Sequence, residues 1–317
     1  MTEPTGPTGP TSPTAATTPT GPTGPLCSTA ARHRGDPMLG TAAPATRWLL
    51  IEHPGGWAPA ALDSPGIGDD IAEQLHRTAL DVGARVVLIR RPGRAVVPGP
   101  REQRRWTVLD LDGRQQWGTW RQPADLLAAG DALRRGPADS VGGHPPDPLL
   151  LVCTHGRHDV CCAVRGRPVA QALAAQWPEQ TWECTHIGGD RFAANLLVVP
   201  DGTVYGGLDA ATAVDVVQGH LAGSVDLEHL RGFTAHRPPV QAALAAVLRA
   251  HGPAAVGDVR PGRVVGEGDT WRVEVLGDGP LPPSSSVVVR RTTQPPAKLT
   301  CRAQGDATAY VWTAEVT

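Results

Sequence analysis

Residues 147–177 read DPLLLVCTHGRHDVCCAVRGRPVAQALAAQW, and this stretch decides the fold. The apolar run at 149–152 predicts a buried strand, and residues 166–177 have the composition of a helix. The loop between them carries Cys153, Cys161 and Cys162. Strands that pass through a loop into a helix build α/β sheets, and functional groups gather where such strands end. We therefore expect an α/β fold with a site at the end of this strand.

Similar elements are predicted on both sides of this stretch. Before it, the pattern indicates a strand near 47–52, a helix over 68–83, strands at 84–91 and 104–111, and a helix over 123–135. After it come a strand at 181–186, two strands within 192–208, and helices near 209–222 and 237–251. From residue 258 onward the chain predicts short strands at 270–275, 284–291 and 309–316. The two halves share a loose similarity of element order.

This order suggests four segments. Residues 1–46 contain PTGPTGPTSPTAATTPTGPTGP, with almost no large apolar side chain, and are predicted to be a disordered tail. Residues 47–140 form an N-terminal α/β domain in this interpretation, and residues 147–257 form a second α/β domain after a Pro/Gly-rich linker at 134–148. Residues 258–317 are expected to be a small C-terminal β-rich extension.

Composition and charge exclude several classes of partner. The 29 basic and 31 acidic side chains give a formal net charge of -2, so the broad basic surface that binds nucleic acid is not expected. No apolar run has the length of a membrane span, and no secretory signal is recognisable. We expect no membrane association and a cytoplasmic location. In that reducing compartment, clustered cysteines favour metal binding or redox chemistry over disulfides.

Two pairs of residues are candidates for a metal site. Cys153 and Cys162 have eight residues between them, so the loop can fold back and bring both sulfurs to one point. Adjacent side chains tend to diverge, so at most one of Cys161 and Cys162 is expected to face Cys153. His186 ends a predicted strand, and the following two glycines permit a tight turn that directs Asp190 to the same place. Together these residues predict a four-ligand site.

Other residues have simpler interpretations. Cys27, Cys184 and Cys301, taken singly, are typical of small buried apolar residues. His155 and His158 are interpreted as groups that stabilise the loop or support the ligands. Gly66 and Gly68 match too little of the dinucleotide-binding fingerprint to predict a nucleotide site.

Two segments carry a resemblance to a known family. CTHGRHDVCCAVRGRPVAQAL (153–173) and THIGGDRFAANLLVVPDGTVYGGL (185–208) are similar to the signature segments of the sucrase/ferredoxin-like family. The likeness extends to residues 36–57 and 221–244, and so to most of the chain from about Cys27 onward. It implies a thioredoxin-like ferredoxin domain at 147–257, preceded by a second α/β domain for which a thioredoxin-like fold is one alternative.

The resemblance also implies a ligand set. Family members with a characterised cluster hold a 2Fe-2S centre with two cysteines and two histidines, and the matching positions here are Cys153, Cys162, His186 and Asp190. The second histidine is thus an aspartate in this chain. Cys161, Cys184, His155 and His158 are alternatives for the fourth ligand. A carboxylate in place of a neutral imidazole is expected to lower the reduction potential relative to a two-histidine site.

Three functions follow as hypotheses. The first is a 2Fe-2S electron-transfer protein that works with an unidentified redox partner protein. The second is a zinc or other mononuclear metal site in the same pocket, because two cysteines, a histidine and an aspartate also suit zinc. The third is a metal-free thiol redox enzyme that uses Cys153 or Cys162. Whether the protein is an enzyme stays open, but glycosidase chemistry is not supported, because no pair of facing carboxylates can be assigned.

Overall fold

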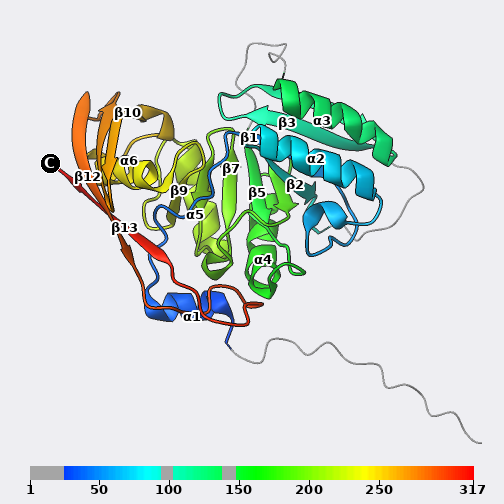
Figure 1. The fold of residues 1–317 in the computed structure, drawn as a ribbon, viewed down its shortest axis with the longest axis horizontal. Helices are drawn as coiled ribbons and strands as arrows, with labels where there is room; N and C mark the ends of the chain where they lie inside the picture. Colours follow the sequence, from blue (N-terminus) through cyan, green and yellow to red (C-terminus); the bar gives the residue numbers. More distant parts are fainter. Residues whose placement is uncertain (1–24, 94–102, 138–147) are drawn as a thin grey trace, which may run out of the picture.

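A nine-stranded mixed β-sheet forms the centre of the computed structural model, which describes residues 25–93, 103–137 and 148–317 (Figure 1). The strands lie in the order β4-β3-β1-β2-β6-β5-β7-β8-β9. In chain order they are β1 (Arg47–Glu52), β2 (Arg85–Arg90), β3 (Arg104–Asp110), β4 (Gln115–Trp120), β5 (Leu149–Cys153), β6 (Thr181–Cys184), β7 (Leu196–Val199), β8 (Thr203–Tyr205) and β9 (Leu230–Phe233). The large mixed sheet confirms the predicted α/β class.

The two halves of this sheet have the same strand arrangement. In the first half β1 is parallel to β2 and antiparallel to β3, and in the second half β5 is parallel to β6 and antiparallel to β7. Helix α2 (Asp69–Asp81) makes the crossover in the first half, and α4 (Val160–Gln176) makes it in the second. The halves join where β2 pairs antiparallel with β6, and Ile89 lies opposite Cys184. This pairing places the end of β5 near the middle of the sheet.

Helices cover one face of the sheet. Leu49 and Ile51 of β1 pack with residues of α2 and α3 (Leu126–Arg135), and Leu150 and Val152 of β5 pack with residues of α4 and α5 (Ala210–Leu221). Alternate strand residues point to the other face, where they form a separate core with Ala42 and Ala45 from the segment before β1. Cys153, Cys162 and Cys184 belong to this second core.

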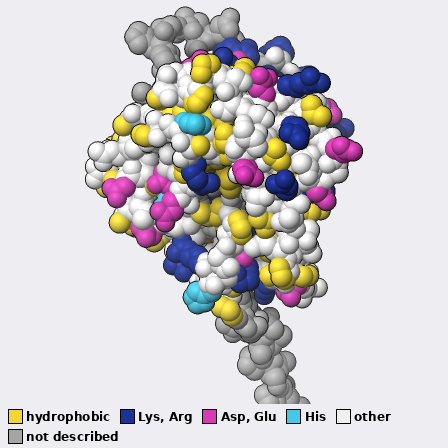
Figure 2. Space-filling view, turned by 90° about the vertical axis from the view of Figure 1, so that its left-hand side faces the viewer, with side chains coloured by type: hydrophobic (Ala, Val, Ile, Leu, Met, Phe, Trp, Pro, Cys, Tyr) yellow, Lys and Arg dark blue, Asp and Glu magenta, His cyan; other side chains and the backbone are white. Residues whose placement is uncertain are grey.

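A smaller antiparallel sheet completes the C-terminal part. Its strands, in the order β10-β11-β12-β13, are β10 (Val259–Glu267), β11 (Thr270–Gly277), β12 (Ser284–Thr293) and β13 (Tyr310–Val316). Helix α6 (Pro238–His251) lies between this sheet and the rest of the molecule, and their apolar residues share one core (Figure 1). Figure 2, seen from the side of this sheet, shows acidic and basic side chains interspersed with apolar ones.

The predicted tail needs a correction. Residues 25–46, which the sequence interpretation included in a disordered segment at 1–46, are ordered: helix α1 spans Cys27–Arg34, and Cys27 and Ala31 are buried. Side chains from elsewhere anchor this helix, so its own low apolar content was misleading. Residues 1–24 lie outside the described residues, as does most of the proposed linker.

The remaining predictions concern the domain division, the strands and membrane-spanning helices. The predicted four-part division stays a prediction, although segments 47–140 and 147–257 contribute to one continuous sheet and segment 258–317 contains the four-stranded sheet. Strands β4 and β9 were not predicted, because QQWGTW is polar and LRGF is short and contains a glycine. Among the described helices, none combines the length and apolarity needed to cross a bilayer.

Candidate metal centre

The first turn of α4 brings Cys162 to the end of β5. Asp159 caps the helix by accepting a hydrogen bond from the backbone N–H of Cys161 at 2.8 Å. Gly166 lets the helix approach the strand, because a Cβ atom there would lie 2.1 Å from the carbonyl oxygen of Cys153. The helix start and the strand end are therefore held against each other.

The segment after β6 brings in the other two predicted residues. Gly188 and Gly189 have positive φ angles of 97° and 76° and make the tight turn that precedes Asp190. The buried guanidinium of Arg231 donates hydrogen bonds to the carbonyl oxygen of Gly188 at 2.8 Å and to Oδ1 of Asn195 at 2.9 Å. A buried cation thus fixes this turn from the side of β9.

Three of the four predicted residues form one compact group, and Asp190 borders it through Cys162 and His186. The ligand atoms of Cys153, Cys162 and His186 lie within 4.8 Å of one another. Oδ1 of Asp190 lies 3.3 Å from Sγ of Cys162 and 3.0 Å from Nδ1 of His186. The His186 Nδ1 atom is buried and, despite this close contact, has no partner with hydrogen-bond geometry. A buried imidazole nitrogen beside two thiols and a carboxylate is a donor set that suits a metal ion.

The two other histidines of the site differ in role. His155 is buried, and its ring contacts the carbonyl oxygen of Ala58 at 2.8 Å and the backbone N–H of His186 at 3.3 Å, so both ring nitrogens have partners. His158 stacks on the His186 ring with 3.8 Å between centroids, and its Nε2 is 3.8 Å from Oδ2 of Asp190. His155 therefore supports the loop, and His158 is the nearer alternative ligand.

The four groups also shift one another's proton affinity. The adjacent Cys162 thiol holds the pKa of Cys153 well below its ordinary value, and the contact with Cys153 raises the pKa of Cys162. Burial favours a neutral His186 ring, but its contacts with Asp190 and Cys153 raise the pKa of His186 to about 9. Burial acts against the Asp190 carboxylate, but His186 keeps the pKa of Asp190 below its ordinary value. A metal ion that binds here must displace protons.

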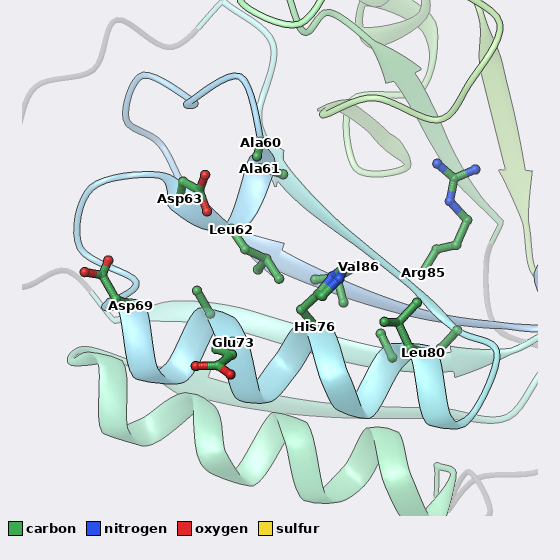
Figure 3. Close-up of a pocket in the computed structure, with 13 residues that line it drawn as sticks. Ala60, Ala61, Leu62, Asp63, Asp69, Glu73, His76, Leu80, Arg85 and Val86 are labelled. Atoms are coloured by element: carbon green, nitrogen blue, oxygen red, sulfur yellow. The ribbon is translucent and has the colours of Figure 1, made fainter.

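Two cavities lie near this part of the molecule. One of about 350 Å³ is lined by residues that include His158, His186, Asp190 and Thr300, so it opens directly on the site. A larger one of about 620 Å³ lies between α2 and the turn at 60–63 (Figure 3). Its walls combine apolar residues with the polar side chains of Asp63, Asp69, Glu73, His76 and Arg85, and no thiol lines it. Of the two cavities, it is therefore the smaller one that is lined by residues of the candidate metal centre.

A second group of buried ligand-type side chains was missed by the sequence interpretation. Cys27, Asp159, Cys161 and Cys301 have their ligand atoms within 4.8 Å of one another. Cys27, Cys184 and Cys301 are all buried, as predicted; Cys184 lies in the sheet core, whereas Cys27 and Cys301 lie against Cys161. The sequence offered one indication of this group. Cys161 and Cys162 are adjacent, so their side chains diverge, and Cys161 must contact a different part of the protein from Cys162.

Comparison with known proteins identifies a family. A family model described as sucrase/ferredoxin-like matches residues 38–232. The match covers both halves of the large sheet and all four residues of the candidate metal centre, but neither Cys27 nor Cys301. No curated protein and no solved structure matches the chain.

Proposed function

Because the chain belongs to the sucrase/ferredoxin-like family, we propose that it is a cytoplasmic electron-transfer protein with a 2Fe-2S cluster held by Cys153, Cys162, His186 and Asp190. One observation carries the proposal. Two buried thiols and an imidazole nitrogen lie within 4.8 Å of one another, and a buried carboxylate lies against one of these thiols and the imidazole. Such a cluster, when bound, accepts and returns one electron.

The donor set fits an asymmetric cluster. The two cysteines come from one strand-loop-helix unit, and His186 and Asp190 come from the next loop. Thiolates would then hold one iron, and a nitrogen and an oxygen would hold the other, with Asp190 contributing the negative charge that a second histidine would lack. The surrounding turn is fixed by Arg231 and α4 is fixed by Gly166, so the ligands are positioned before the cluster binds.

His186 supports a route for electrons. The sulfurs of Cys153 and Cys162 belong to side chains that are 1 % exposed, whereas the His186 side chain is 26 % exposed and lines the 350 Å³ cavity. A partner protein that docks over this cavity would approach the cluster most closely at the histidine edge. We therefore propose that the redox partner binds on this side.

A mononuclear zinc site is the second candidate, and the compactness of the site favours it. Two ligands of one zinc ion are at most about 4.6 Å apart, which is twice the Zn–S bond length. The ligand atoms of Cys153, Cys162 and His186 lie within 4.8 Å of one another, so small side-chain movements would bring these three to one ion, with Asp190 close to two of them. A metal-free thiol enzyme is less well supported, because the same two cysteines are inaccessible to a substrate disulfide.

Anaerobic purification tests the proposal. Iron, acid-labile sulfide and zinc are measured together with the visible absorption spectrum, for wild type and for Cys153→Ala and Cys162→Ala. Brown protein with two irons and two sulfides per chain, lost in both variants, supports the cluster. Colourless protein whose variants lose one zinc supports the second candidate and contradicts the first.

A further inference from the structure

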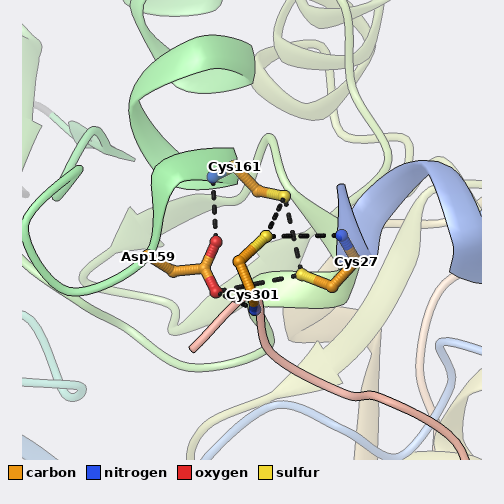
Figure 4. Close-up of side chains that lie close together, drawn as sticks. All are labelled: Cys27, Asp159, Cys161 and Cys301. Carbon is orange, nitrogen blue, oxygen red and sulfur yellow. Dashed lines mark hydrogen bonds between the residues drawn. The ribbon is translucent and has the colours of Figure 1, made fainter. Parts of the chain in front are cut away.

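We propose that Cys27, Cys161, Cys301 and Asp159 form a second metal site, which binds one zinc ion and joins α1 and the connection between β12 and β13 to the start of α4 (Figure 4). This site is separate from the proposed redox centre. Cys161 serves it, whereas the neighbouring Cys162 serves the first site.

The sulfur positions suit a single ion. Sγ of Cys161 lies 3.5 Å from Sγ of Cys27 and 3.3 Å from Sγ of Cys301. Two thiolates on a tetrahedral zinc ion are roughly 3.8 Å apart, given a Zn–S length of about 2.3 Å. Small movements of the side chains would therefore accommodate the ion. The side chains of all three cysteines are directed toward one point in Figure 4.

Asp159 supplies the fourth ligand and an unbalanced charge. It is fully buried, and its partners in the described part of the chain are the backbone N–H groups of Cys161 and Cys301 and the thiol of Cys27. Among all the residues that the structure describes, no cationic side chain forms an ion pair with Asp159. Buried charges are normally paired with a cation or bound to a metal, so a cation at this point would complete the environment of Oδ2.

Backbone and hydroxyl donors also surround the sulfurs. The N–H of Cys27 donates to Sγ of Cys301 at 3.3 Å, and the hydroxyl of Ser28 donates to Sγ of Cys161 at 3.2 Å. Donors of this kind stabilise thiolates, which are the form that binds metal. Together with Asp159 they orient the ligands in the way that supporting groups do in protein metal sites.

The two segments that meet α4 at this site, α1 and the connection after β12, bury little apolar surface. The buried residues of α1 are Cys27, Ser28 and Ala31. Cys301 lies in the 16-residue connection, 294–309, that leaves the four-stranded sheet after β12 and returns to β13, and its buried residues are Cys301 and Ala309. Segments that bury so little apolar surface are commonly secured by a disulfide or a metal. Here the metal would cross-link two segments that contribute few buried apolar side chains.

Zinc content measured with the first site removed tests this proposal. In the Cys153→Ala/Cys162→Ala background, any zinc that remains belongs to the second site. We expect about one zinc per chain, lost when Cys301→Ala is added and retained when Cys184→Ala is added as a control. Zinc that is absent from the background protein, or that survives Cys301→Ala, would overturn the proposal.

Cysteine labelling of wild-type protein provides a test that needs no variant. With zinc bound, Cys27, Cys161 and Cys301 should resist alkylation, and a chelator should make all three reactive while Cys184 stays protected. Peptide mass spectrometry identifies the labelled sites. Equal labelling with and without chelator contradicts the proposal, as does a disulfide between Cys161 and either partner in freshly purified protein.

Discussion

At the scale of single residues, Asp190 determines how this centre differs from the two-histidine pattern. Its carboxylate faces His186 and Cys162, whereas the adjacent Arg191 lies 3.5 Å from Asp36 instead. The ion-pair partner of Arg191 is therefore Asp36 and not its neighbour Asp190. Asp190 is placed to act as a ligand or to hold His186 beside the thiols.

Asp190→His should keep the cluster and raise its reduction potential by on the order of 100 mV, because a neutral nitrogen replaces a negative oxygen on the iron. Asp190→Ala should weaken or lose the cluster. Voltammetry of wild type and both variants checks this. Identical potentials and spectra for wild type and Asp190→His would show that Asp190 is not a ligand.

The protonation of His186 gives a pH prediction for metal-free protein. The pKa of about 9 in the folded state exceeds the ordinary value of about 6.5. Its stabilising contribution is therefore complete below about pH 6.5 and is lost as the pH rises through 9. Metal binding, which needs the neutral ring, should tighten over the same interval. An NMR titration of the His186 ring tests the value, and Asp190→Asn should lower it. A midpoint near 6.5 in wild type would contradict the prediction.

At the scale of elements, the start of α4 organises both clusters. The side chains of Cys161 and Cys162 diverge, as predicted for adjacent residues, and each belongs to a different cluster. The pattern at 149–177 made β5 and the body of α4 predictable, but the helix begins at Val160 and not at residue 166, so Cys161 and Cys162 lie in its first turn and not in the loop. Gly166 and Pro168, which are unfavourable inside a helix, account for the later start that the sequence predicts. The second cluster was not predictable in this way, because Cys27 and Cys301 lie 134 and 140 residues from Cys161. Only the tertiary fold brings them together.

Gly166→Ala should separate α4 from β5. Alanine in a helix is ordinarily about 0.5–1 kcal/mol more stable than glycine, but here the new methyl group would meet the Cys153 carbonyl oxygen. We expect a net destabilisation of about 1–3 kcal/mol and reduced metal loading. Thermal unfolding and metal analysis measure both. Gly257→Ala, where no atom lies within 4 Å of the added Cβ, is the control. A more stable Gly166→Ala protein with full loading would show that the close approach is unimportant.

At the scale of the whole molecule, the two halves act as one scaffold. Their strand order repeats, but β2 and β6 join them into a single sheet, so the site lies near the junction. Apolar periodicity predicted most strands and helices of both halves. It did not predict α1, because the contacts of that helix are polar or come from cysteines. Arg32, for example, donates to the carbonyl oxygen of Gly207 at 2.9 Å.

Removal of residues 1–36 should therefore destabilise the protein by about 2–4 kcal/mol, since several hydrogen bonds worth about 1 kcal/mol each are lost with α1. Removal of residues 1–24 should have little effect, because that tract offers almost no large apolar side chain. Denaturant unfolding of the two truncated proteins decides. Equal stability would mean that α1 contributes nothing to the fold.

Pulsed electron paramagnetic resonance of the chemically reduced protein, prepared with ¹⁵N-labelled histidine, tests whether the chain holds a 2Fe-2S centre through His186. We expect the signal of a reduced 2Fe-2S centre with hyperfine coupling to one histidine nitrogen, lost in His186→Ala. A signal coupled to two histidines would replace Asp190 by His158 as the fourth ligand. Protein with no such signal and with zinc bound by Cys153 and Cys162 would contradict the proposed function.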